Sequence, residues 1–266
     1  MRSIRCWLIE SGQSPPYLYR MKIEYHFLEE TDSTNRWLRQ RGGGEAQAVV
    51  CWTDYQSAGR GCGNNSWESE RGKNLLFSLL VRPAFLAAKD QFVLSMMMAN
   101  AVRETLTSLL PESEVSVKWP NDIYVSDQKI CGILIESQLR GSLIAETVLG
   151  VGLNVNQARF LSDAPNPVSL LQLLGHEVDR RALLGTIVEA FCAGLERLEG
   201  EPGYAKDVHQ NYLEHVYRRE GLHAYCDEHG RFEARLSTVE PDGHLVLCDS
   251  DGGVRRYAFK EVSYIV

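Results

Sequence analysis

Residues 115–136 read VSVKWPNDIYVSDQKICGILIE, and this stretch decides the fold class. Pro120 cannot donate a hydrogen bond within a sheet, and Asn121-Asp122 favours a turn, so a single long strand is excluded. The pattern instead predicts short strands at 115–119, 122–125 and 129–136, followed by another at 143–154.

Helical and strand patterns continue on both sides of this stretch. The small hydroxyl and amide residues at 31–35 (TDSTN) are the usual signal for a helix start. Strands are expected at 22–28, 48–53 and 75–81, and helices at 36–40, 89–110, 180–198 and 203–217. Hairpin-like strands with separate helices predict an α+β fold, with a mixed sheet and packed helices.

The two ends of the chain differ from this central region. From about residue 220, turn signals at 228–230, 241–243 and 251–253 separate four or five short strands. We therefore expect one large domain, which would carry the catalytic site, at 22–218 and a small β-barrel at 219–266. Roughly 45 residues is below the size of a comfortably stable domain, so the barrel should dock on the larger one. Residues 1–21 are expected to be a disordered tail, or the product of a start codon placed before Met21.

Composition narrows the class of protein. The 266 residues carry 28 Lys plus Arg and 35 Asp plus Glu, a net charge of −7, which argues against a large non-specific nucleic-acid surface. No apolar run is long enough to cross a bilayer. The seven cysteines are odd in number and form no C-x-x-C pair, so neither a disulfide framework nor a zinc site is expected. We expect the protein to occupy a reducing cytoplasm.

A glycine-rich segment, QSAGRGCGNNSW at 56–67, is the first candidate for chemistry. Glycines let backbone N–H groups approach an anion, and Arg60 adds a permanently charged donor set suited to phosphate or carboxylate. The segment therefore predicts a phosphate-gripping loop, with an ordinary turn or linker as the alternative. It is not a P-loop, because no G-K-[ST] follows.

Three further segments place polar side chains where a ligand could meet them. Lys118 follows a strand and could neutralise a reacting carboxylate and phosphate, with Asp122 orienting it; an ordinary solvated lysine is the alternative. Asn154, within the apolar run 150–156, needs a hydrogen-bond partner from a nucleotide or from the protein. Residues 33–35 cap a helix or hold a small polar head group.

Taken in order, these segments resemble the biotin–protein ligase family. The matching pieces are T-D-S-T-N at 31–35, Q-S-A-G-R-G at 56–61 with Trp67 after it, K-W-P-N-D at 118–122, G-I-L-I-E at 132–136 and G-V-G-L-N-V-N at 150–156. The resemblance implies a class II synthetase-like catalytic domain with an SH3-like C-terminal barrel. It also implies the reaction: biotin and MgATP form biotinyl-5′-AMP, and a lysine of a biotin carboxyl carrier domain then takes the biotin.

The resemblance assigns roles residue by residue. Lys118 and Arg60 would be catalytic. Contacts to biotin would come from Ser33, Thr34, Asn35, Gln56, Arg60, Gly61, Cys62, Lys118 and Gly132. Contacts to the nucleotide would come from Arg60, Trp67 and Asn154. Mg²⁺ would arrive with ATP, and no protein ligand to a metal is identified.

One departure from the family pattern concerns the loop. Members usually continue G-R-G-x-R-G, whereas Cys62-Gly63-Asn64-Asn65 stands here, with one positive charge fewer. We expect this loop to hold the adenylate less tightly. Some twenty residues precede the first matching strand, so we expect a ligase that does not bind DNA as a repressor.

Several alternatives stay open from the sequence. A lipoate or octanoate ligase of the same fold is the nearest, followed by a non-catalytic binding module and, more distantly, a DNA-binding regulator. No membrane association is expected, and homodimerisation is left open.

Overall fold

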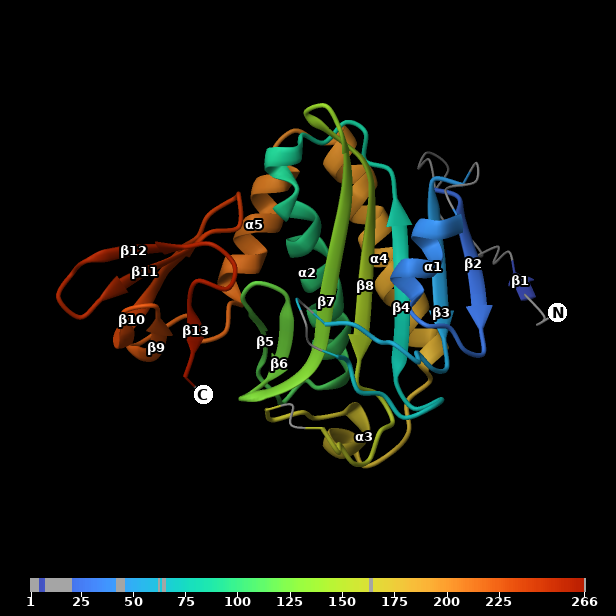
Figure 1. The fold of residues 1–266 in the computed structure, drawn as a ribbon, viewed down its shortest axis with the longest axis horizontal. Coiled ribbons are helices and arrows are strands. Elements are labelled where there is room, and N and C mark those ends of the chain that lie inside the picture. Colours follow the sequence, from blue (N-terminus) through green and yellow to red (C-terminus); the bar gives the residue numbers. More distant parts are fainter. Residues whose placement is uncertain are drawn as a thin grey trace.

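The computed structural model describes residues 5–7, 21–41, 46–61, 63, 66–162 and 165–265. Its centre is an eight-stranded sheet in the order β1-β2-β3-β4-β8-β7-β6-β5 (Figure 1). The strands are β1 (Arg5–Trp7), β2 (Ile23–Leu28), β3 (Ala48–Thr53), β4 (Leu75–Val81), β5 (Val115–Lys118), β6 (Asp122–Val125), β7 (Gln128–Arg140) and β8 (Leu143–Leu153). Only β2 and β3 pair in parallel; the other neighbours are antiparallel, so the sheet is mixed as predicted.

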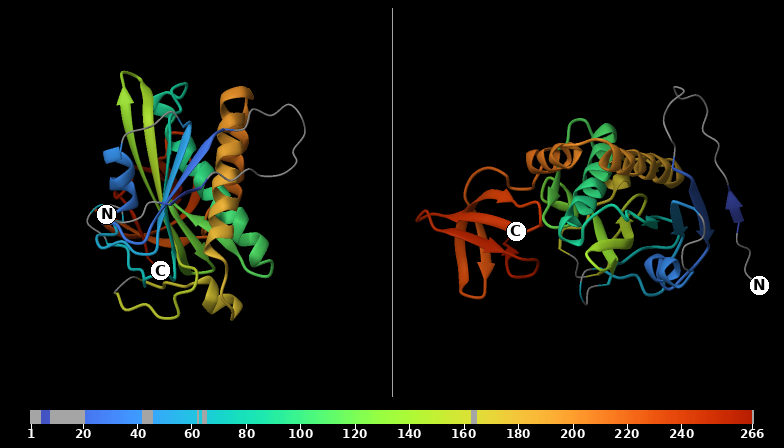
Figure 2. Two further views of the ribbon diagram at one scale, coloured as in Figure 1. Left: turned by 90° about the vertical axis from the view of Figure 1, so that its right-hand side faces the viewer. Right: turned by 90° about the horizontal axis from the view of Figure 1, so that it is seen from above.

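Helices cover both faces of this sheet. They are α1 (Thr34–Arg41), the 3-10 helix η1 (Ala88–Asp90), α2 (Phe92–Leu109), α3 (Leu170–Leu174), α4 (Arg180–Gly200) and α5 (Tyr204–Glu214). The side view in Figure 2 shows α2 and α4 on one face and α1 on the other. The α1 side of the sheet is therefore only partly covered by a helix.

The apolar runs explain where the core lies. All of β4 (LLFSLLV) is buried, as is nearly all of β3, because both faces of these central strands are covered. Helix α2 packs against α4 and α5 on one side and the sheet on the other, which buries most of its length. Asp179 begins α4 by accepting hydrogen bonds from the N–H groups of Arg181 and Ala182 at 2.8 and 3.3 Å.

The C-terminal module, residues 223–265, is a separate sheet of five antiparallel strands. These are β9 (His223–Asp227), β10 (Gly230–Val239), β11 (Leu245–Asp249), β12 (Val254–Tyr257) and β13 (Ser263–Tyr264), in the order β12-β11-β10-β9-β13. The arrangement is consistent with the expected SH3-like barrel. In Figure 1 the module lies beside β5, β6 and α5. The indole Nε1 of Trp119 donates to the carbonyl of Gly243 at 2.9 Å, which ties the two parts together.

Some elements differ from the sequence-based expectations. Residues 5–7 of the predicted tail form β1, which pairs with β2, while residues 1–4 and 8–20 lie outside the described part of the chain. Helix α1 begins at Thr34 rather than at 36, and α3 was not predicted. Among the described helices, none has both the length and the apolar character needed to cross a membrane.

Candidate active site

A cavity of about 960 Å³ opens on the α1 side of the sheet, next to the C-terminal module. Its walls come from the start of α1, the glycine-rich segment, strands β7 and β8, the turn between β5 and β6, and the C-terminal module. The cavity is lined by all the described residues to which the resemblance assigned a role: Ser33, Thr34, Asn35, Gln56, Arg60, Gly61, Trp67, Lys118, Gly132 and Asn154. Cys62 lies outside the described residues.

One end of the cavity is a buried polar cluster at the start of α1. Gln56 Oε1 accepts from the N–H of Thr34 at 2.8 Å and from its hydroxyl at 3.1 Å, so a residue from a distant segment caps the helix. Ser78 Oγ lies 2.6 Å from Thr34 Oγ1 and 2.5 Å from Asn35 Oδ1. Asn35 Nδ2 donates to Glu136 at 2.9 Å. These bonds fix the polar groups in place before any ligand arrives.

Three glycines form the floor of the cavity on β7 and β8. A Cβ atom at Gly150 would lie 2.2 Å from Asn35 Oδ1, so only glycine lets that amide rest on the strand. Gly132 and Gly152 are partners across the two strands. Cβ atoms there would lie 2.9 and 2.5 Å from the indole of Trp67, which packs on both. The glycines therefore admit Asn35 at one end and Trp67 at the other.

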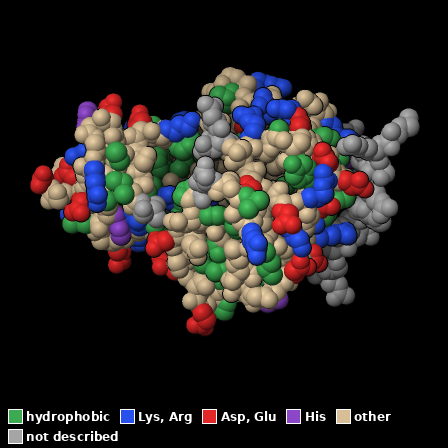
Figure 3. All heavy atoms as spheres, turned by 60° about the horizontal axis from the view of Figure 1, so that its bottom comes forward, with side chains coloured by type: hydrophobic (Ala, Val, Ile, Leu, Met, Phe, Trp, Pro, Cys, Tyr) green, Lys and Arg blue, Asp and Glu red, His purple; other side chains and the backbone are tan. Residues whose placement is uncertain are grey.

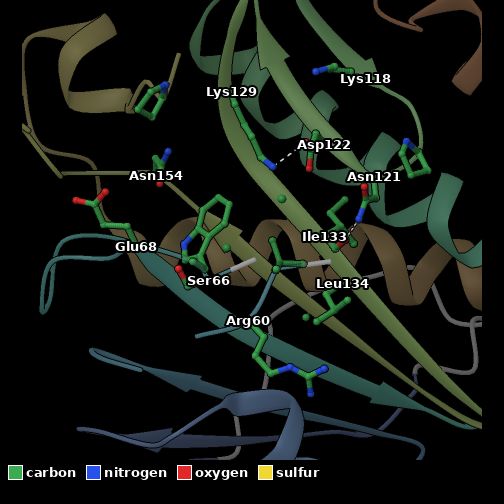
Figure 4. Close-up of a pocket in the computed structure, with 18 of the residues that line it drawn as sticks. Arg60, Ser66, Glu68, Lys118, Asn121, Asp122, Lys129, Ile133, Leu134 and Asn154 are labelled. Atoms are coloured by element: carbon green, nitrogen blue, oxygen red, sulfur yellow. Dashed lines mark hydrogen bonds and ion pairs between the residues drawn. The ribbon is translucent and has the colours of Figure 1, made fainter. Parts of the chain in front are cut away.

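Lys118 lies at the opposite end of the cavity from Arg60 (Figure 4). Its ammonium donates to the hydroxyl of Tyr124 at 3.0 Å and lies 4.7 and 5.1 Å from the ring centroids of Tyr124 and Tyr264. Burial lowers the pKa of Lys118 below the ordinary lysine value; Asp122 opposes this decrease and Lys129 adds to it. The half-buried lysine is not the solvated residue of the alternative interpretation.

Asp122 does not orient Lys118, contrary to the sequence-based expectation. The two residues are partners across β5 and β6, but Asp122 Oδ2 pairs with Lys129 Nζ at 2.7 Å, as Figure 4 shows. Side chains directly opposite in a sheet need not be the closest charged pair, because the longer Lys129 reaches Asp122 from β7. Lys129 was missed in the sequence, because it stands three residues before Gly132 at the start of the strand and belongs to none of the recognised motifs.

Arg60 and Asn154 differ in the partners that the protein itself gives their side chains. Arg60 is exposed, and its guanidinium has no ion-pair partner among the described residues. Asn154 is buried; its Nδ2 donates to the carbonyl of Val168 at 3.1 Å, while Oδ1 has no partner in the described part of the chain. The protein thus satisfies half of this amide and leaves an acceptor free.

The rest of the cavity wall was not predicted. Glu68 accepts from the N–H groups of Leu161 and Ser162 at 2.8 Å each. Burial raises the pKa of Glu68, but these hydrogen bonds outweigh it and lower the pKa below the usual value. From the C-terminal module come Phe259, Lys260, Val262, Ser263 and Tyr264. No short motif marks these residues, because they meet the cavity only through docking of the module.

The arrangement suits an anionic substrate with a polar head and an apolar body. The polar cluster at α1 can bind amide-like groups, the glycine floor and Val151 can hold an apolar body, and Lys118, Lys129, Arg60 and Lys260 supply positive charge. No histidine is among the described residues that line the cavity. The four cations suit the site to stabilising negative charge on a bound ligand.

Comparison with known proteins places this arrangement in context. The sequence model of the Biotin/lipoate A/B protein ligase family matches residues 27–154. The biotin–[acetyl-CoA-carboxylase] ligase of Paracoccus denitrificans is 30% identical over 234 residues, covering 83% of this chain and 92% of that protein. The bifunctional ligase/repressor BirA of Escherichia coli is 35% identical over 179 residues, covering 65% of this chain and 54% of that protein.

Solved structures agree on the fold. The biotin protein ligase of Aquifex aeolicus in complex with biotin and ATP superposes with a TM-score of 0.73 at 23% identity, covering 90% of this chain and 97% of that one. The chain spans about half the length of the first curated relatives that it matches, among them the Escherichia coli and Bacillus subtilis proteins.

Proposed function

This chain belongs to the biotin–protein ligase family, and from that premise we propose that it forms biotinyl-5′-AMP from biotin and MgATP and then transfers biotin to a protein lysine. The observation that carries the proposal is the single cavity that joins the polar cluster at α1, the glycine floor and the cations Lys118 and Arg60. A site for one small acid alone would not need positive charge at both ends.

Biotin would lie along β7 and β8 with its polar ring at the α1 end. Thr34, Asn35 and Gln56 are already held by internal hydrogen bonds, so they would meet the ring with little loss of side-chain entropy. The ring and its aliphatic chain would lie along the glycine floor between Asn35 and Trp67, the side chains that rest on Gly150 and Gly132. The carboxylate would then extend toward Lys118.

Adenylation would occur between Lys118 and Arg60. A carboxylate oxygen of biotin attacks the α-phosphorus of ATP, a new P–O bond forms, and the bond to the departing pyrophosphate breaks. Two anions must approach each other, so fixed positive charge lowers the barrier. Because the Lys118 ammonium is half-buried, its field is less screened than that of a surface lysine.

The nucleotide would occupy the side of the cavity near Trp67 and Asn154. The indole offers a flat apolar surface, and the unpartnered Oδ1 of Asn154 can accept a hydrogen bond from an N–H or O–H group. Two carboxylates line the cavity among the described residues, Glu68 and Asp122, and both are engaged by other groups. The Mg²⁺ of MgATP would therefore keep mainly phosphate and water ligands.

In the second step the ε-amine of a lysine attacks the acyl carbon of the mixed anhydride; AMP leaves and the amine loses a proton. The acceptor we propose is the lysine of a biotin carboxyl carrier domain. On the face in Figure 3 acidic and basic side chains are interspersed, which favours a protein partner over a DNA duplex. A cytoplasmic location remains a prediction.

The test is pyrophosphate release from ATP by the purified protein, with biotin, lipoate or octanoate as the acid. Biotin should be strongly preferred, and a carrier domain should then gain one biotin by mass spectrometry. Lys118→Ala should greatly slow pyrophosphate release. Preference for lipoate would assign the chain to the other branch of its family, and no labelling with any acid would favour a binding module. A near-normal rate in Lys118→Ala would refute the role of that lysine.

A further inference from the structure

Lys260 belongs to the C-terminal module, yet it faces the cavity of the central domain. It lies in the turn between β12 and β13 and lines the cavity together with Phe259, over whose ring its ammonium lies 5.7 Å from the centroid. Its side chain is exposed and has no carboxylate partner among the described residues. It is therefore a positive charge that the protein itself does not neutralise.

The backbone of Lys260 is unusual for a residue with a side chain. Its φ is +75°, in the left-handed region that favours glycine. Four non-glycine residues in the described part of the chain have a positive φ, and Lys260 is the one that lines the cavity. The N–H of Glu261 donates to the carbonyl of Ala258 at 3.2 Å, which closes a turn with Lys260 at the position where glycine is favoured. A lysine there costs backbone strain, which calls for a role of its side chain beyond formation of the turn.

The ammonium of Lys260 lies directly against the glycine-rich segment. A Cβ atom at Gly63 would lie 2.6 Å from Lys260 Nζ and 3.3 Å from its Cε. Gly63, with φ +70°, thus leaves room for the ammonium a few residues from Arg60. This is the part of the segment where the sequence has one positive charge fewer than its family pattern.

The other cations of the cavity are more restricted. Lys129 is paired with Asp122 at 2.7 Å, and Lys118 is covered by two tyrosine rings. Arg60 and Lys260 are the two cavity-lining cations that are exposed and also lack a carboxylate partner in the described chain, and they belong to different parts of the protein. A phosphate chain that enters the cavity would meet one from the loop and one from the module.

We propose that Lys260 is a phosphate-binding residue of the nucleotide site, which supplies from the C-terminal module the positive charge that the loop lacks. The inference rests on the proposed function, because it takes the nucleotide to be ATP. It also revises the expectation that the loop holds the adenylate weakly. Lys260 of the C-terminal module would replace the positive charge that the glycine-rich segment lacks. Gly63 is then a positioning residue, because its missing side chain admits the ammonium.

The experiment compares Lys260→Ala, Lys260→Gly and Lys260→Arg with the unaltered protein. Lys260→Ala should raise the KM for ATP about tenfold in biotin-dependent pyrophosphate release, with the KM for biotin unchanged. Lys260→Gly removes the backbone strain and should fold at least as well, yet show the same rise. Lys260→Arg should restore most of the affinity. Lys206→Ala, on the exposed side of α5, is the control and should change neither KM.

A second pair of variants separates the position of the ammonium from backbone strain. Gly63 and Gly72 have nearly the same φ, +70° and +73°, but nothing lies within 4 Å of a Cβ atom at Gly72. Gly63→Ala should raise the KM for ATP severalfold, whereas Gly72→Ala should leave it unchanged. An equal effect of the two would mean that strain alone is responsible and would overturn the role of Gly63.

The outcomes distinguish this inference from the proposed function. If the protein turns over with biotin but Lys260→Ala keeps its KM for ATP, the inference is wrong and the function stands; an effect confined to carrier transfer would have the same meaning. If the protein does not turn over with biotin, the function fails, and calorimetric titration with ATP decides on Lys260. Weaker ATP binding by Lys260→Ala supports the inference, and equal or undetectable binding overturns it.

Discussion

Gly150 and Gly152 lie two residues apart on β8, and alanine at each should disturb a different end of the cavity. A Cβ atom at Gly150 would lie 2.2 Å from Asn35 Oδ1, and one at Gly152 would lie 2.5 Å from Trp67 Cε2. Contacts this short do not persist, so Asn35 must move in the first variant and Trp67 in the second. The first change should affect biotin and the second the nucleotide.

The size of each effect follows from what the displaced side chain loses. Asn35 gives up its contact with Ser78 Oγ at 2.5 Å, worth about 0.5–1.5 kcal/mol. The added methyl group costs about 1–3 kcal/mol by overpacking, and alanine returns about 0.5–1 kcal/mol of backbone entropy. The net destabilisation of Gly150→Ala is about 0.5–4 kcal/mol. Gly152→Ala should cost less, because the Trp67 Nε1 that moves has no hydrogen-bond partner in the described chain.

The assay measures the KM for biotin and for ATP separately in pyrophosphate release, with urea unfolding alongside. Gly150→Ala should raise the KM for biotin about tenfold, since loss of roughly 1.4 kcal/mol of binding corresponds to that factor. Gly152→Ala should raise the KM for ATP instead. Gly185→Ala in α4, where nothing lies within 4 Å of the added Cβ, is the control and should change neither. If both β8 variants raise the same KM, the assignment of the two ends is refuted.

The remaining predictions concern single side chains. Because burial lowers the pKa of Lys118 and the charged form is the active one, adenylation should decline with rising pH earlier than for an ordinary lysine, whose pKa is about 10.4. Lys118→Arg should move that decline to higher pH in a rate profile, and an unchanged profile would assign it to another group. Arg60→Ala should slow adenylation by about 10²–10³-fold in single-turnover experiments, and a normal rate would remove Arg60 from the reaction. Trp119→Phe loses the bond to Gly243 and should lower the free energy of unfolding in urea by about 0.5–1.5 kcal/mol; no change would mean that this bond does not hold the module.

Local patterns predicted the central elements well. The limits of β3, β4 and β6 follow directly from apolar runs bounded by turn residues, because a strand buried on both faces is apolar along its whole length. Helix α1 starts earlier than predicted because Gln56, more than twenty residues away, accepts the N–H of Thr34. Helix α3 did carry a local signal: the Ser169–Gln172 capping box, followed by Gly175 in the left-handed conformation.

The residues of the candidate site also fall into two groups: those that a local motif marks and those that only tertiary packing brings to the cavity. Lys118, Gly132 and Asn154 stand in contiguous motifs, so the sequence alone named them as candidates, and all three line the cavity. Lys129 pairs with Asp122 only because β6 and β7 are neighbours, and Tyr264 reaches Lys118 only because the C-terminal module docks. Such contacts depend on tertiary packing, which spacing along one sequence does not reveal.

The position of Tyr264 also bears on why so small a module is retained. The centroid of its ring lies 5.1 Å from the Lys118 ammonium, and cation–π contacts of desolvated groups are worth about 0.5–2 kcal/mol. Without the module, Lys118 would be open to water, its pKa would return toward the ordinary value and its field would be screened. The module thus forms one wall of the cavity beside Lys118, and its small size is tolerable because it docks on the central domain, to which the bond from Trp119 ties it.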